Sequence, residues 1–318
     1  MNGIVNFIKN WALIIALLIG SVGNKFFVQY ADKTVYLIFV MLLFTFCRID
    51  PSHLKFRKVH ALFLLIQVGG AMAMYYALSA LGWSDMAESC MLCFLCPTAA
   101  ASAVVTMKLG GDGASNTTYV LLSSLMVALV VPLWFPLIHV PTQEIPFWQA
   151  FWSILKRVLP LLAGPFLLAM LLKYTLRKVH DAFARWHEVS FYLWASCLIF
   201  AAAQMVDAMN HSSAGLGMMA VLALGSLAIC SLQFFLGKRL GGHYGDRISG
   251  GQSLGQKNII LGIWIAGMFL MPSTGETPLA IVGLGTYIIW QNIINSWQLY
   301  RKRMRDLGEK AHHAELVP

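Results

Sequence analysis

Residues 250–271 of the chain have the sequence GGQSLGQKNIILGIWIAGMFLM, in which Lys257 and three amide side chains precede a clean apolar run. A charge at mid-bilayer costs about 2.5–3.5 kcal/mol, so an intramembrane lysine normally faces a cavity and marks a functional site. The alternative is that Lys257 snorkels to the membrane surface near Arg247. The ten residues that separate the two would span about 15 Å of helix. That length disfavours snorkelling.

The composition indicates a membrane protein. Of its 318 residues, 58% are hydrophobic and 12% are charged, whereas an ordinary globular chain has about 25% charged residues. The net charge of +9 comes from basic residues in short loops and the C-terminal tail. This pattern is typical of membrane orientation and not of nucleic-acid binding.

The six cysteines all fall inside apolar runs, and Cys90, Cys93 and Cys96 have the spacing of part of an iron–sulfur motif. No fourth ligand is apparent, and thiols three residues apart drift around a helix. We therefore interpret the cysteines as small buried hydrophobic residues and expect no metal centre and no cofactor.

Ten segments are apolar and long enough to span a bilayer of about 30 Å. They are residues 9–28, 34–50, 58–81, 85–109, 117–139, 147–175, 188–208, 213–237, 248–271 and 277–300. Basic residues concentrate in every second connection and after residue 300. The positive-inside rule therefore places both termini in the cytoplasm. Ten spans divide into two sets of five, and an odd number per set predicts an inverted repeat.

The fourth segment of each half is interrupted, which is the best sequence indication of a transporter binding site. In the first half, Cys96-Pro97 ends a half-helix, and we expect Thr98 to cap a second one over residues 99–108. Ser102 and Thr106 would share one face of it. A simple proline kink is the alternative.

In the second half, Gly250, Gly251 and Gly255 are predicted to permit non-helical backbone, with a half-helix beginning at Asn258. The N-termini of the two half-helices would attract an anionic group.

Three motifs together resemble the bile acid:sodium symporter family. They are Cys96-Pro97 before a serine-containing half-helix, Gln252-x3-Gln256, and Trp290-Gln291-Asn292-Ile293. The resemblance implies a bacterial-type plasma-membrane transporter with ten helices in one unit, residues 1–318. It implies panel-type helices in 9–50 and 147–208, core-type helices in 58–139 and 213–300 with crossing broken helices 4 and 9, and a cytoplasmic tail in 301–318.

The same resemblance implies alternating access and an organic-anion substrate, such as a bile acid, a sulfo-conjugate or a pantothenate-like acid. The predicted partners are this small anion and the lipid bilayer, without nucleic acid. No nucleophile–base pair suggests an enzyme. The residues expected to bind substrate or couple its transport are Pro97, Thr98, Ser102, Thr106, Ser124, Gln252, Gln256, Lys257, Asn258 and Asn292.

The chain departs from the family pattern where sodium would bind. Gln252 stands in place of a glutamate, Lys257 in place of an asparagine, and Ala103 in place of the asparagine after Ser102. Possible sodium ligands that remain are Ser102, Ser124, Gln252 and Gln256, and Asn258 after a one-residue slip. An ammonium beside a missing carboxylate disfavours sodium.

We therefore hypothesise that Lys257 replaces the sodium ion, which leaves a sodium-independent carrier or one coupled to protons through the lysine. The alternatives are a sodium-coupled symporter with degenerate sites, and a receptor that keeps the fold without active transport.

Overall fold

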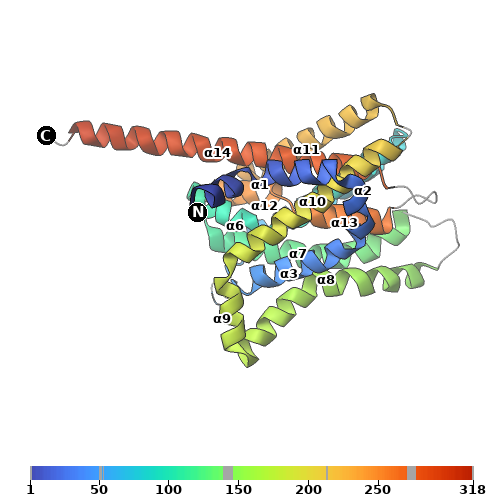
Figure 1. The fold of residues 1–318 in the computed structure, drawn as a ribbon, viewed down its shortest axis with the longest axis horizontal. Coiled ribbons are helices and arrows are strands. Elements are labelled where there is room, and N and C mark those ends of the chain that lie inside the picture. The colour runs from blue at the N-terminus through green and yellow to red at the C-terminus, as the bar shows by residue number, and fades with distance from the viewer. Residues whose placement is uncertain are drawn as a thin grey trace.

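A computed structural model describes residues 2–49, 52, 54–138, 146–212, 214–270 and 277–316 (Figure 1). Within this part of the chain every named element is helical. They are α1 (Asn2–Val22), α2 (Asn24–Phe27), the 3-10 helix η1 (Val28–Lys33), α3 (Thr34–Phe46), α4 (Lys58–Ala80), α5 (Ser84–Leu95), α6 (Ala101–Leu109), α7 (Gly113–Ile138), α8 (Phe147–Thr175), α9 (Arg177–Arg185), α10 (His187–His211), α11 (Leu216–His243), α12 (Arg247–Gly255), α13 (Ile259–Phe269) and α14 (Ala280–Leu316). The predicted all-α class is confirmed.

Among the described residues, six helical stretches are long and apolar enough to cross a membrane. They are Asn24–Phe46, Lys58–Ala80, Gly113–Ile138, Phe147–Thr175, Phe191–His211 and Leu216–His243. Their outer surfaces carry exposed leucines such as Leu65, Leu171 and Leu224, which in a soluble protein would form a large apolar patch. The chain is therefore a multi-pass membrane protein.

The long helices run side by side along the long axis of the molecule (Figure 1). α1 begins and α14 ends at the same end of this bundle, and α14 extends far beyond it. α9 lies at that end too, and it runs across the direction of the long helices.

The helix α14 corrects the predicted boundary at residue 300, since it continues to Leu316. Contacts one turn apart support this extension. Arg301 lies over the Trp297 ring at 5.4 Å, and Lys302 pairs with Asp306 at 3.1 Å.

The prediction that Gly250 and Gly251 break the helix was wrong, because Arg247–Gly255 is the continuous helix α12. These glycines allow close packing instead. A Cβ on Gly250 would lie 2.8 Å from the Cα of Gly241, and one on Gly251 would lie 2.6 Å from the Lys238 side chain. Without side chains at these positions, α12 folds back tightly on α11.

Candidate functional site: two paired helix breaks

The two interruptions of the helices meet each other. Residues 96–100 separate α5 from α6, and residues 256–258 separate α12 from α13. Thr98 and Lys257 form an antiparallel β-bridge. The Ala99 N–H donates to the Gln256 carbonyl at 2.9 Å, and the Asn258 N–H donates to the Pro97 carbonyl at 2.8 Å. We call this arrangement the crossing.

The crossing explains how non-helical backbone is tolerated in the interior of this membrane protein. Pro97 has no N–H and holds Cys96 out of the helical region, at ψ 135°. Backbone groups freed in this way need partners inside the protein. Each break supplies hydrogen bonds to the other, so neither leaves its peptide groups to the lipid.

Side chains complete the hydrogen bonding on both sides of the bridge. On one side, the Thr98 N–H donates to the Ser123 hydroxyl of α7 at 3.1 Å. On the other, the Gln291 side chain of α14 accepts from the Lys257 N–H at 2.8 Å and donates to the Lys257 carbonyl at 3.2 Å. The Gln291 side chain thus satisfies both backbone groups of Lys257.

The C-terminal end of α5 receives buried donors. The last four carbonyls of a helix lack partners within it and carry partial negative charge. Here Gln233 donates to Cys93 at 3.0 Å, and Gln67 donates to the carbonyls of residues 95 and 96 at 2.8 and 3.1 Å. The Lys257 ammonium donates to the Phe94 carbonyl at 3.0 Å.

Lys257 is therefore an interior residue. Its exposed fraction is 1%, and its ammonium lies at the end of α5 rather than at the membrane surface near Arg247. A cation at a helix C-terminus is electrostatically favourable. The alternative, in which Lys257 snorkels to the membrane surface near Arg247, is therefore wrong.

A second buried polar cluster surrounds Asn116 of α7. Ser102 donates to Asn116 Oδ1 at 2.5 Å, and Asn116 Nδ2 donates to the Ser253 hydroxyl at 3.0 Å. The Thr98 hydroxyl donates to the Ser253 carbonyl at 2.5 Å. Thr98 therefore joins the two breaks. The prediction that Thr98 caps α6 was wrong, because the residue before α6 is Ala100 and no side chain caps the helix.

Four buried oxygens near these clusters have no hydrogen-bond partner in the described part of the chain. They are Gln233 Oε1, Gln252 Oε1, Gln256 Oε1 and Thr106 Oγ1. The amide nitrogen of Gln252 donates to Asn295 Oδ1 at 2.9 Å, so its oxygen is left to accept from another donor or a cation. Ser102 and Thr106 share a fully buried face of α6, as expected.

Not every predicted residue joins the crossing. The Ser124 hydroxyl donates to the Val120 carbonyl of its own helix at 2.8 Å. Asn292 does the same with Ile288 at 2.7 Å. Asn258, by contrast, joins the crossing through its backbone N–H, and its side chain caps α13 by accepting from the Leu261 N–H at 3.4 Å.

The sodium ion implied by the family fits these residues incompletely. Sodium prefers oxygen ligands, and the unpartnered amide oxygens of Gln252 and Gln256 meet that need. Among the described residues that the hydrogen bonds above bring to the crossing, no carboxylate balances the charge, and Lys257 supplies an ammonium instead. The amide oxygens are compatible with a cation, whereas the net charge of the site is not.

The predicted set of site residues left out several buried polar side chains. They are Gln67, Asn116, Gln233, Ser253, Gln291 and Asn295. Except for Asn116, which lies just before the segment that begins at residue 117, each is an uncharged polar residue inside an apolar segment, and this is the signal that could have identified it. Two buried tyrosines also support the crossing: Tyr119 donates to Gln67 at 2.8 Å and Tyr287 donates to the Gly255 carbonyl at 2.9 Å.

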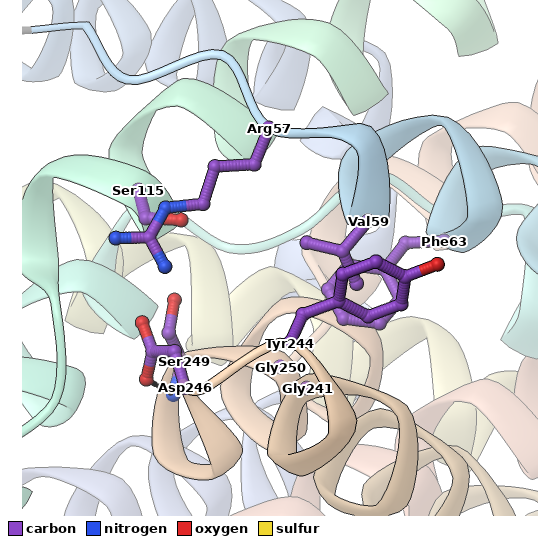
Figure 2. A pocket seen from close by; sticks show the side chains of 9 residues that line it. All are labelled: Arg57, Val59, Phe63, Ser115, Gly241, Tyr244, Asp246, Ser249 and Gly250. Atoms are coloured by element: carbon purple, nitrogen blue, oxygen red, sulfur yellow. Dashed lines mark hydrogen bonds between the residues drawn. The ribbon is translucent and has the colours of Figure 1, made fainter.

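A further polar cluster joins the ends of α4, α7 and α12 (Figure 2). Asp112 accepts from Arg57 at 2.8 Å and from the backbone N–H of Ser115 at 3.1 Å. Burial disfavours its charged form, but the Ser115 N–H and the neighbouring cations prevail, so the pKa of Asp112 is lowered.

Asp246 lies on the other side of this cluster, facing Arg57 across a cavity of about 10 Å³ (Figure 2), which suits a single water molecule. Its Oδ1 caps α12 by accepting from the Ser249 N–H at 2.9 Å. The cluster therefore fixes the start of α12, and it lies outside the crossing.

Comparison with known proteins supports the family. Residues 59–212 match the Sodium Bile acid symporter family. This stretch runs from the start of α4 to the end of α10 and contains the first helix break. No curated protein matches the chain. The match confirms the resemblance drawn from the sequence: residues 59–212 of the chain are similar to the sodium bile acid symporter family.

Proposed function

We propose that the chain is a secondary active transporter of an organic anion, with ten spans in an inverted five-plus-five repeat. The observation that carries the proposal is the pairing of the two helix breaks through Thr98 and Lys257. Paired interruptions in corresponding segments of two halves are the usual place of a transporter binding site. α6 and α13 both begin at the crossing. Their N-termini bring partial positive charge to one place, which suits a carboxylate or sulfonate.

In this proposal, alternating access moves the core-type helices, residues 58–139 and 213–300, relative to the panel-type helices, residues 9–50 and 147–208. The crossing belongs entirely to the core-type helices, so substrate bound there would be carried with them. Both chain ends would lie in the cytoplasm of a bacterial cell, where the basic connections are predicted to lie.

We assign Lys257 the role of a built-in cation. Its ammonium is buried and bonded to a backbone carbonyl oxygen, and carbonyl oxygens are also ligands for hard cations. A lysine fixed there neutralises the negative end of α5 without a mobile ion. Transport would then be independent of sodium, or driven by protons that the lysine binds and releases.

A specific observation favours a second candidate, a sodium-coupled symporter with degenerate sites. The amide oxygens of Gln252 and Gln256 are buried and have no donor among the described residues. Two such oxygens would gain from a bound sodium ion, and the cost of leaving them unpaired is about 1–3 kcal/mol each.

Transport by the purified protein in liposomes separates these candidates, with radiolabelled taurocholate and pantothenate as probes. We expect exchange of labelled for unlabelled probe without sodium, and no more than about twofold stimulation by a sodium gradient, because a coupling ion would need the missing carboxylate. Stimulation of tenfold or more would support the symporter instead. Absence of exchange with both probes would contradict transport of these anions.

Substitution of Lys257 tests its role. Lys257→Met keeps the length of the side chain but removes the charge and leaves the Phe94 carbonyl without its donor. We expect at least a tenfold loss of exchange, or exchange that now requires sodium. Lys108→Met, at an exposed lysine at the end of α6, should leave exchange unchanged. Lys257→Arg restores the charge, and recovery of exchange would separate loss of the cation from misfolding.

A further inference from the structure

The short helix α9 differs from the other helices in direction and in its surface. It joins α8 to α10 at the end of the bundle where α1 begins and α14 ends, and it runs across the long helices (Figure 1). The backbone leaves helical geometry on both sides of it, at Leu176 (φ −127°, ψ 58°) and Trp186 (φ −80°, ψ 50°). If the long helices cross the bilayer, α9 lies parallel to the membrane surface.

One side of α9 is an apolar stripe. Leu176, Val179, Phe183 and Trp186 recur at intervals of three and four residues, which places them on one face of a helix. Phe183 packs against Phe44 of α3, with ring centroids 5.0 Å apart. The other three are exposed by 56%, 40% and 57%, so only part of the stripe is covered by protein.

The opposite side of α9 is basic. Arg177, Lys178 and Arg185 lie in α9 with the single acid Asp181, and Lys173 lies just before them in the last turn of α8. Residues 173–185 therefore have a net charge of +3. The Arg177 side chain is 85% exposed and lies 4.0 Å from Asp181. Lys178, Asp181, Ala184 and Arg185 together line an open surface on this side.

We propose that α9 is an interfacial helix that binds the headgroups of anionic phospholipids. A basic face opposite a face with leucine, phenylalanine and tryptophan is typical of helices that lie in the headgroup layer. Arginine and lysine near an anionic membrane surface are attracted to lipid phosphates. The exposed apolar stripe enters the acyl boundary, while Arg177 and Lys178 contact phosphate.

This contact would anchor one part of the molecule to the membrane. α9 packs directly on α8 and α3, so lipid bound to α9 holds these helices in place. The inference does not depend on the proposed transport, because lipid binding is measured directly on the protein at rest.

Native mass spectrometry of the full-length protein in detergent tests the proposal, with phosphatidylglycerol and phosphatidylcholine added separately. The double variant Arg177→Gln/Lys178→Gln should weaken phosphatidylglycerol binding at least fivefold at low salt and leave phosphatidylcholine binding unchanged, because only the anionic headgroup meets the removed charges. A second variant, Trp186→Ser, should also reduce retention of the anionic lipid.

The matched control is Arg301→Gln/Arg303→Gln, which removes the same charge from α14 at the same end of the molecule. It should bind phosphatidylglycerol like the wild type. Equal losses in both double variants would mean a general effect of net charge and would overturn the proposal, as would wild-type binding by the α9 variant.

Discussion

At the residue scale, the crossing depends on matching almost every buried donor with an acceptor. Lys257 was predictable as an important residue because a charge is conspicuous in an apolar segment. Its partner, the Phe94 carbonyl, was not, because backbone acceptors are the same at every position of a sequence. Gln291 and Asn292 are adjacent amides and equally plausible from sequence alone. Only the rotation of α14 decides that Gln291 contacts the crossing and that Asn292 bonds its own helix.

This difference between neighbours gives a direct test of stability. Gln291→Leu leaves the Lys257 N–H and carbonyl without their partners, so we expect the free energy of unfolding to fall by about 2–4 kcal/mol. Asn292→Leu removes one bond within a helix, at a half-buried side chain, and should cost less than about 1 kcal/mol. Unfolding in mixed detergent–SDS micelles measures both. Similar losses in the two variants would contradict the assigned role of Gln291.

At the scale of elements, hydrophobic patterns predicted the long helices well. α4, α7 and α8 begin and end within four residues of the predicted spans. α9 was missed because its nine residues are too polar for a span and were assigned to a loop. α12 was misjudged because glycine favours irregular backbone in isolation, whereas here tight packing on α11 offsets its low helix propensity.

Two glycine substitutions, one in α12 and one in α11, should have opposite effects on the free energy of unfolding. Gly250→Ala places a Cβ against backbone atoms of Gly237 and Gly241, and overpacking of this kind costs about 1–3 kcal/mol. Gly217→Ala, near the start of α11 where a Cβ meets open space, should stabilise the helix by up to about 1 kcal/mol. The same unfolding assay measures both. A stabilised Gly250→Ala protein would show that the two helices can separate without loss.

At the scale of the whole molecule, the sequence predicted more spans than helix length alone supports. Six helical stretches meet the criterion for length and hydropathy. α5 with α6, and α12 with α13, are divided by the breaks of the crossing, so each piece is short by itself. In the proposed ten-span arrangement each of these two pairs of short helices forms one span, which is not counted when each helix is judged by its own length.

The proposed ten-span topology predicts which end of the molecule faces the cytoplasm. Nine of the proposed spans lie between residues 33 and 303, and an odd number puts these residues on opposite sides of the membrane, with the basic end inside because cations in short loops resist translocation. We expect a membrane-impermeant maleimide to label Lys33→Cys in intact cells. It should label Arg303→Cys and Lys178→Cys only after the membrane is opened. The six native cysteines are buried, so background labelling should be low.

Labelling of Arg303→Cys in intact cells would contradict the cytoplasmic C-terminus. Labelling of Lys178→Cys there would place α9 at the outer surface, where the positive-inside rule does not put four basic residues.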